Sequence, residues 1–366
     1  MRHEITGDSL HDGDSLHGPS RVVIEDGLIV SIEPLEGPAR HRMILPGLVD
    51  LQMNGYRHVD VAECSHDDFV ALDAMLLAEG TTSWLATVVT APLDRLSTTI
   101  ARLHEWVSRG DTGCRGIHVE GPFLGLAPGA HNPRWIIDID KQWLSALPSG
   151  VRLVTLAPEQ DSAAAAVAQL VGQGVVVSLG HTRAADAEFD AAVSAGAAMV
   201  THLFNGMSGV HHREAGVALS ALVDPRVTVG MIADGVHVSP RAMGLAFAAK
   251  TPRGVCLVSD SIAWDSGWAR SMKVQVEGGA PRLPDGTLAG SSSSLMHCVA
   301  TVARHGAASV EGAVTSATST PADLIGFPQA GRIRVGSPAE MVCIDDDFHV
   351  TEVHRRLVSL RGSQTD

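Results

Sequence analysis

The stretch Val175-Val-Val-Ser-Leu-Gly-His181 is a short apolar run that ends in a histidine. Two other runs have the same form, Gly116-Ile-His-Val-Glu120 and Ala198-Met-Val-Thr-His202. Runs of this length that are rich in Val and Ile are typical of buried β-strands. Each of the three expected strands therefore ends in a side chain that can bind a metal ion.

The same alternation of short apolar runs and longer helical patterns extends over most of the chain from Met43. Repeated strand–helix units in this number favour a closed parallel (β/α)8 barrel of the TIM type over an open sheet. The expected strands span residues 44–51, 82–89, 116–120, 151–157, 175–179, 198–202, 227–232 and 255–259, and the helices between them include residues 67–78, 93–107, 161–172, 184–195 and 240–249.

The two ends of the chain have β character instead. Residues 21–32 alternate around Asp26-Gly27, which predicts a hairpin, and residues 331–345 have a similar β-rich content. We therefore expect a small β-sandwich domain formed by residues 1–44 and 331–366, with a barrel of residues 45–330 inserted between them. A further hairpin is expected in residues 274–290, around Asp285-Gly286.

Composition limits the kind of protein and the kind of partner. The chain has 366 residues, of which 45% are hydrophobic, enough for a large core. The first residues lack the apolar segment of a signal peptide, no run is long enough to span a membrane, and five scattered cysteines fit a reducing compartment, so we expect a cytoplasmic protein. A net charge of −14 argues against nucleic acid or an anionic membrane as partner, and an anionic small substrate would need a local basic cluster.

In a barrel of this type the active site lies at the carboxyl ends of the strands. A single polar residue at a strand end is often only a helix cap or a histidine bonded to backbone. Here, however, nearly every expected strand ends in one, so a common rim of functional groups is the better interpretation. The residues are Asp50, Gln52, Asn54, Glu120, His181, His202, Asp234, His237 and Asp260.

Glu120, His181 and His202 form a set of one carboxylate and two imidazoles. Such a set leaves a fourth position of a divalent ion open, which is typical of catalytic zinc. Asp260 is the expected general base and acid, because a carboxylate can take the proton of an acidified water and return it to a leaving amine. His131, in Pro128-Gly-Ala-His-Asn-Pro133, either polarises a substrate carbonyl or is an ordinary surface histidine.

Several motifs occur in order along the chain. They are Leu45-Pro-Gly-Leu-Val-Asp50 followed by Asn54-Gly55, His118-Val-Glu-Gly-Pro122, Gly129-Ala-His-Asn-Pro133, Leu179-Gly-His-Thr182, Thr201-His-Leu-Phe-Asn-Gly-Met207, Arg213-Glu214, Ile232-Ala-Asp-Gly-Val-His237 and Leu288-Ala-Gly-Ser291. Together they resemble the N-acetylglucosamine-6-phosphate deacetylase family of the amidohydrolase superfamily. The first motif marks only the superfamily, whereas the His-Val-Glu-Gly-Pro motif is fairly specific to the family.

The resemblance implies hydrolytic deacetylation of N-acetylglucosamine 6-phosphate to glucosamine 6-phosphate and acetate in amino-sugar catabolism. It implies one divalent metal per subunit, with Zn2+ expected, held by Glu120, His181 and His202, and Asp260 as proton shuttle. A homodimer is implied as well, because Arg213 would reach the phosphate of a neighbouring subunit. The residues that the resemblance places around substrate are Ala130, His131, Asn205, Gly206, Arg213, His237, Leu288, Ala289 and Gly290.

The chain departs from the family pattern at several positions. Gln52 and Asn54 stand where many superfamily members have a His-x-His pair, so one metal is expected instead of two. Gly206 replaces a common alanine. After Asp260, the segment Ser-Ile-Ala-Trp-Asp-Ser-Gly-Trp replaces the more usual Ala-x-x-Ala-Gly. Its residues Trp264 and Trp268 could reshape the pocket, stack on a sugar or only pack a loop.

Other functions remain open at this point. A related amidohydrolase that acts on N-acetylgalactosamine 6-phosphate, on another N-acetyl amino sugar or on another amide would keep the same metal ligands and Asp260. A non-enzymatic sugar-phosphate sensor is a poorer candidate, since it would need neither an open metal position nor a base. The tandem Gly7-Asp-Ser-Leu and Gly13-Asp-Ser-Leu resembles a serine-esterase signature, but no buried strand and turn precede the first serine. An acidic turn or edge hairpin is expected there.

Overall fold

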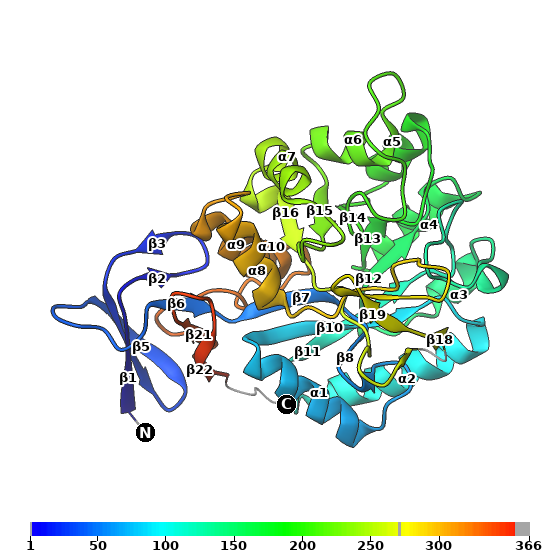
Figure 1. Cartoon of the computed structure of the whole chain (residues 1–366). Coiled ribbons are helices and arrows are strands. Elements are labelled where there is room, and N and C mark those ends of the chain that lie inside the picture. Colours follow the sequence, from blue (N-terminus) through cyan, green and yellow to red (C-terminus); the bar gives the residue numbers. More distant parts are fainter. Residues whose placement is uncertain (1, 270–271, 356–366) are drawn as a thin grey trace.

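The computed structural model describes residues 2–269 and 272–355 (Figure 1). Its largest sheet has eight strands in the order β16-β15-β14-β13-β12-β11-β10-β7. A parallel bridge between Met53 and Ser261 joins the carboxyl ends of the first and last of these strands, so the sheet is nearly closed. The predicted (β/α)8 fold is confirmed. The strands are β7 (Leu48–Met53), β10 (Thr81–Val89), β11 (Cys114–Glu120), β12 (Val151–Leu156), β13 (Val176–Leu179), β14 (Met199–Val200), β15 (Thr228–Met231) and β16 (Val255–Leu257).

Helices surround the barrel (Figure 1). In α2, for example, Leu96, Ile100 and Leu103 are buried at helical spacing, and the helix ends at Gly110, which adopts the left-handed conformation of a helix C-cap. The helices are α1 (His66–Ala78), α2 (Leu93–Arg109), α3 (Lys141–Ser145), α4 (Ala163–Gly172), α5 (Asp186–Ser194), α6 (Gly216–Val223), α7 (Pro240–Lys250), α8 (Leu295–Arg304), α9 (Val310–Ala317) and α10 (Ser319–Leu324), with short 3-10 turns at Pro133–Trp135 and Pro252–Gly254.

The barrel interior is apolar in its lower part and polar near the carboxyl ends of the strands. Leu51, Leu153 and Met199 belong to one buried cluster inside the sheet, and Ile325 beyond α10 packs against the same cluster. Nearer the carboxyl ends, the buried Thr155 hydroxyl bonds both the His118 Nε2 atom and the Thr201 hydroxyl, each at 2.8 Å. A firm apolar floor therefore supports a polar layer at the rim where the predicted site residues lie.

The two ends of the chain form a small β structure beside the barrel, at the left of Figure 1. One sheet has the order β1-β4-β5 and the other β22-β21-β6-β2-β3, and they share a buried cluster that includes Ile5, Ile24 and Met341. The strands are β1 (Arg2–Gly7), β2 (Leu10–His11), β3 (Leu16–His17), β4 (Ser20–Glu25), β5 (Leu28–Pro34), β6 (Met43–Pro46), β21 (Met341–Ile344) and β22 (Val350–His354). The tandem repeat thus forms the edge hairpin β2–β3.

The expected strand of residues 44–51 is divided at Gly47. Residues before it pair in β6 with β21 of the terminal sheet, and residues after it form barrel strand β7. A Cβ at Gly47 would collide with the side chain of Thr82, so this crossing requires glycine. The domain boundaries themselves stay a prediction, and residues 1 and 356–366 of the expected terminal domain lie outside the described residues.

The segment after the last barrel strand contains the expected turn at Asp285-Gly286, where Arg282 and Leu288 form an antiparallel bridge. A further hairpin precedes it, in which strand β19 (Gln275–Glu277) pairs with β20 (Ala280–Arg282) across Gly278 and Gly279. Both of these glycines have positive φ, the backbone conformation that such a turn requires. The remaining short strands are β8 (Gly55–Tyr56), β9 (Val59–Asp60), β17 (Trp268–Ala269) and β18 (Met272–Lys273). Among the described residues, no helix combines the length and apolar character needed to cross a membrane.

Candidate active site

The predicted metal ligands and base lie where the barrel strands end. Glu120 is the last residue of β11, and His181, His202 and Asp260 each follow a strand by two or three residues. His181, His202 and Asp260 have φ values of 51, 30 and 46°, a region that non-glycine residues seldom occupy. Such conformations concentrate at functional sites, where the surrounding structure holds the backbone in place.

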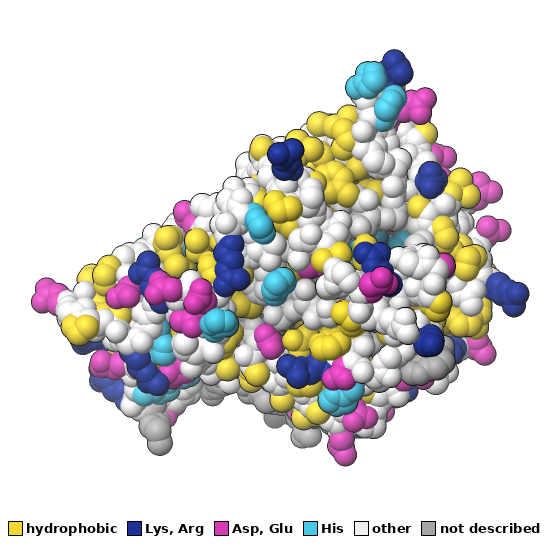
Figure 2. Space-filling view, viewed as in Figure 1, with side chains coloured by type: hydrophobic (Ala, Val, Ile, Leu, Met, Phe, Trp, Pro, Cys, Tyr) yellow, Lys and Arg dark blue, Asp and Glu magenta, His cyan; other side chains and the backbone are white. Residues whose placement is uncertain are grey.

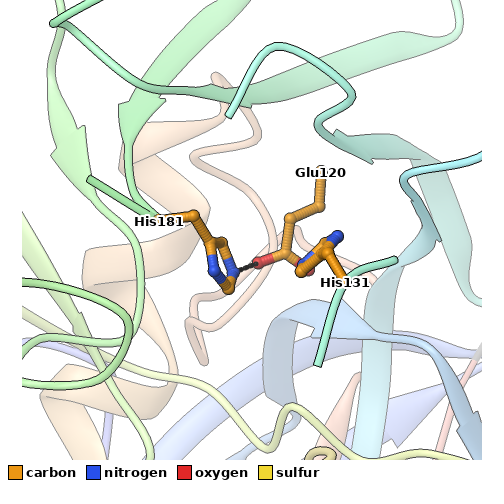
Figure 3. A group of neighbouring side chains, drawn as sticks. All are labelled: Glu120, His131 and His181. Carbon is orange, nitrogen blue, oxygen red and sulfur yellow. Dashed lines mark hydrogen bonds and ion pairs between the residues drawn. The ribbon is translucent and has the colours of Figure 1, made fainter. Parts of the chain in front are cut away.

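Three side-chain atoms of this rim converge on one point. The Nε2 atom of His181 lies 3.2 Å from Oε1 of Glu120, and Nε2 of His202 lies 3.3 Å from the same oxygen. The two Nε2 atoms are 3.0 Å apart. Figure 3 shows the His181 ring directed at the Glu120 carboxylate. The three side chains are at most 7% exposed.

The other ring nitrogens show which atoms are left for a ligand. Nδ1 of His181 lies 3.1 Å from the carbonyl oxygen of Ala127, and Nδ1 of His202 lies 3.0 Å from that of Asn205. A carbonyl can only accept, so each Nδ1 carries a proton, and only Nε2 of each ring is left to bind a metal through its lone pair. The two Nε2 atoms and the carboxylate oxygen lie within 3.3 Å of one another, close enough to share one cation. The donor set fits a divalent metal ion of the zinc type.

Burial and neighbouring charges have opposite effects on the pKa values of these groups. Burial alone would raise the pKa of the Glu120 carboxyl, but hydrogen bonds with His181 and His202 hold that pKa well below its usual value. Burial lowers the pKa of His202, and the Glu120 carboxylate overcomes this effect and raises it. Below them, burial lowers the pKa of His118 to about 4, so this ring is neutral. Glu120 is therefore an anion in a buried site, ready to bind a cation.

His131 lies beside the three converging side chains. Its ring centroid is 4.3 Å from that of His181, and its Nε2 atom is 4.0 Å from Oε2 of Glu120 (Figure 3). Glu120, His131 and His181 thus form a second set of atoms within 4.8 Å that could hold a metal. The shorter distances of His202 favour it as the third ligand. Nδ1 of His131 is 2.8 Å from the Thr90 hydroxyl.

Gln52 and Asn54 donate hydrogen bonds to the two carboxylates of the site. Nε2 of Gln52 donates to Oε1 of Glu120 at 3.1 Å, and Nδ2 of Asn54 donates to Oδ1 of Asp260 at 2.8 Å. Beneath them, Asp50 is fully buried, and burial raises its pKa to about 6 even though Oδ1 accepts backbone bonds from Gln52 and Ser259. Gln52 and Asn54, which occupy the positions of the superfamily His-x-His pair, therefore orient the two carboxylates of the site in this protein.

Glu159 is a site residue that the sequence did not single out. Its carboxylate accepts hydrogen bonds from the backbone N–H of Leu126 at 3.2 Å and of Arg183 at 2.9 Å, and from the Thr182 hydroxyl. The residue thus ties the loop that contains Ala127 to the segment after His181. Its position just beyond β12, the fourth barrel strand, is the feature from which the sequence could have predicted a role at this rim.

A cavity of about 340 Å³ opens at this rim. Figure 2 shows histidine surface within a hollow on this face, with a basic side chain at its edge. The cavity gathers every residue predicted to bind the metal, contact substrate or transfer a proton except Arg213, which is exposed on the loop before α6. It also includes Arg282 and Thr287, which sequence reasoning missed. The full lining is Glu120, Gly129, Ala130, His131, His181, His202, Asn205, Gly206, Ile232, His237, Asp260, Arg282, Thr287, Leu288, Ala289 and Gly290.

Trp264 of the atypical segment lies beside the cavity and is not among the residues that line it. Trp264 packs against a buried cluster that contains Ile262 and Ala289, together with Ala130 and Leu283. It therefore supports the loops from behind, and among the described residues that line the cavity there is no tryptophan. The side chain of Trp268 lies outside the described residues.

Comparisons with known proteins agree with this geometry. The Amidohydrolase family profile matches residues 43–361. N-acetylgalactosamine-6-phosphate deacetylase of Escherichia coli O157:H7 is 33% identical over 351 residues, covering 90% of this chain and 92% of the relative. The human N-acetylglucosamine-6-phosphate deacetylase is 34% identical, covering 84% of this chain and 81% of the relative.

Solved structures show the same likeness. A mutant of N-acetyl-D-glucosamine-6-phosphate deacetylase from Mycobacterium smegmatis, in complex with N-acetyl-D-glucosamine-6-phosphate, superposes with a TM-score of 0.89 at 32% identity, covering 97% of this chain and 98% of that one. The Thermotoga maritima N-acetylglucosamine-6-phosphate deacetylase gives a TM-score of 0.89 at 30% identity with the same coverage. The chain therefore belongs to the N-acetylglucosamine-6-phosphate deacetylase family of the amidohydrolases.

Proposed function

We propose that this protein is a metal-dependent deacetylase that hydrolyses N-acetylglucosamine 6-phosphate to glucosamine 6-phosphate and acetate. One observation carries the proposal. Glu120, His181 and His202 direct three acceptor atoms at one point, and Asp260 lies in the wall of the same cavity. A ligand set with a carboxylate base beside it is what hydrolysis of an unactivated amide needs. The names of the relatives support the substrate.

The chain's own residues would hold the amide and its attacking water. A divalent ion bound by Glu120, His181 and His202 supplies Lewis-acid chemistry, which polarises a carbonyl and makes a water molecule more acidic. His131 would donate a hydrogen bond to the amide oxygen. The Thr90 hydroxyl lies 2.8 Å from Nδ1 of His131 and holds that side of the ring, which leaves Nε2, the atom nearer Glu120, to face the amide.

Asp260 would move the proton. As the water oxygen bonds to the amide carbon, the Asp260 carboxylate accepts a proton from that water. It then returns the proton to the amide nitrogen as the carbon–nitrogen bond breaks, which releases acetate and the free amine. The amide of Asn54 donates to Oδ1 of Asp260 and thereby orients this carboxylate for both transfers.

Several finer features belong to the same proposal. We expect one zinc ion per chain, because Gln52 and Asn54 offer amides where a second metal would need imidazoles. We expect the remaining predicted residues of the cavity wall, Ala130, Asn205, Gly206, His237 and Leu288 to Gly290, to contact the sugar phosphate. A homodimer is proposed because Arg213, exposed and outside the cavity of its own chain, could then reach the site of a second subunit. A reducing compartment such as the cytoplasm is supported by the five free cysteines.

An acetate-release assay with three sugars tests the proposal. N-acetylglucosamine 6-phosphate should be hydrolysed faster than N-acetylglucosamine, and a chelator should abolish both reactions. N-acetylgalactosamine 6-phosphate is the second candidate substrate, since two relatives of that name are each 33% identical over about nine tenths of the chain. If acetate is released faster from this epimer, the epimer becomes the proposed substrate. If no sugar gives chelator-sensitive acetate release, the proposed function is refuted.

A further inference from the structure

Among the described residues, the cavity wall contains one permanent cation, which no sequence motif identified. Arg282 is the only Lys or Arg among the described residues that line it. The other charged groups of the lining are the carboxylates of Glu120 and Asp260. A chain with a net charge of −14 needs a local positive group if it binds an anionic substrate. Arg282 is placed to supply that charge from the same subunit.

The guanidinium of Arg282 is held by backbone and leaves donors for a ligand. Its Nη1 atom donates to the carbonyl of Gly286 at 2.8 Å, and its Nε atom donates to that of Glu277 at 3.4 Å. The ion pairs of the described residues give it no carboxylate partner. A guanidinium has five N–H donors in a fixed fork, so further N–H groups remain after these bonds. Backbone acceptors orient the side chain without neutralising it.

The position of Arg282 also suits the far end of a hexose phosphate. Arg282 forms an antiparallel bridge with Leu288, and the N–H of Ser291, just beyond Gly290, donates to the carbonyl of Asp260 at 2.8 Å. The hairpin thus extends from the proposed base outward. In a hexose 6-phosphate with a 2-acetamido group, the phosphate and the amide lie on opposite sides of the ring. When the amide faces Glu120, the phosphate points away from the metal ligands.

His237 is not a permanent cation. Its Nδ1 atom lies 2.7 Å from Oδ2 of Asp234, and this acceptor holds a proton on Nδ1. Only Nε2 is then left to face a ligand, as a single polar atom. The guanidinium of Arg282 is charged at every relevant pH and matches phosphate oxygens as a fork. The two side chains line the same cavity, with Arg282 as the stronger anion-binding group.

We infer that Arg282 binds the 6-phosphate of the substrate in cis and thereby sets the preference for phosphorylated amino sugars. The inference rests on the proposed function. It differs from the role expected of Arg213, which would act from a second subunit. Arg282 is a specificity residue, and it takes no part in proton transfer or metal binding.

Matched variants separate this role from a structural one. Arg282→Met should lower kcat/KM for N-acetylglucosamine 6-phosphate by roughly 10- to 100-fold, the effect of losing one or two charge-assisted hydrogen bonds. The same variant should change kcat/KM for N-acetylglucosamine by less than about twofold, because that sugar has no phosphate to bind. Arg282→Lys should retain part of the preference, and Arg334→Met, which removes an exposed arginine of the terminal domain, should change neither value.

Binding of glucosamine 6-phosphate, measured by calorimetry, keeps the test independent of turnover. Arg282→Met should weaken this binding as much as it lowers kcat/KM, while binding of glucosamine stays the same. If the wild-type protein deacetylates none of the sugars, the proposed function fails, but the loss of glucosamine 6-phosphate binding would still support Arg282. Equal losses for phosphorylated and unphosphorylated sugars, or no loss for either, would overturn the inference.

Discussion

Glu159 provides a sharp test of how the loops hold the metal ligands. Its Oε1 atom accepts two backbone hydrogen bonds, from Leu126 and Arg183, and these bonds place the carbonyl of Ala127 against Nδ1 of His181. The substitution Glu159→Gln keeps the size of the side chain but removes its charge. Charged hydrogen bonds contribute about 1.5–3 kcal/mol each and neutral ones about 0.5–1.5 kcal/mol. The two bonds therefore weaken by about 2 kcal/mol together.

Part of that loss should appear as weaker metal binding. Removal of a partner that orients a metal-binding histidine costs about 10- to 100-fold in affinity. We expect Glu159→Gln to raise the zinc dissociation constant about tenfold, which corresponds to about 1.4 kcal/mol of the 2 kcal/mol lost. Gly125→Ala should act in the same direction, because a Cβ at Gly125 would collide with the Glu159 carboxylate. Competition with a chromogenic chelator measures both constants.

A neighbouring acid provides the control. Asp161→Asn removes the same charge two residues away, from an exposed side chain, and should leave the zinc dissociation constant unchanged. The reasoning would be refuted if Glu159→Gln bound zinc as tightly as the wild type, even if the variant melted at a lower temperature. That outcome would make Glu159 a loop residue without influence on His181.

Three further predictions concern the rim of the barrel. Asp260→Asn should lower kcat about 10²- to 10⁴-fold while the bound metal stays at one ion per chain by elemental analysis, because only proton transfer is lost; a kcat close to the wild-type value would contradict this. His131→Asn should lower kcat about 10²- to 10³-fold with a smaller change in KM, and a change confined to KM would remove its role as oxyanion donor. Asp50 has a folded-state pKa of about 6, above the value of 3.8 for an unburied aspartate, so its stabilising contribution is complete below about pH 4 and is lost as the pH rises through 6. Urea unfolding of Asp50→Asn and wild type should therefore show the variant gaining about 3 kcal/mol relative to wild type between pH 4 and pH 8, and a pH-independent difference would show that Asp50 is not ionised there.

The cluster of Glu120, His181 and His202 was predictable because each residue closes an apolar run. The end of a buried strand is a local property of the sequence, and parallel strands of one barrel bring such ends to one rim. The side chains of Glu120, His181 and His202 therefore converge as expected, although β14 covers only Met199–Val200 of the expected strand 198–202.

The features that were missed depend on contacts between distant segments. Gly47 divides the first expected strand because Thr82 approaches it from another strand, and no local pattern records that contact. Glu159 acts through backbone N–H groups of two other loops, which carry no side-chain signature. Arg282 lies between the hairpin turn at Gly278-Gly279 and the predicted turn at Asp285-Gly286, and no local pattern shows that its side chain lines the cavity. Contacts of this kind are set by tertiary packing.

We propose that one metal ion at Glu120, His181 and His202 makes this protein a deacetylase. A titration of metal-stripped protein with zinc, while acetate release from N-acetylglucosamine 6-phosphate is followed, tests this most directly. Activity should rise in proportion to added zinc and reach its maximum at one ion per chain, and Glu120→Gln should gain little activity over the same range. Full activity of the stripped protein, or a maximum only at two ions per chain, would contradict it.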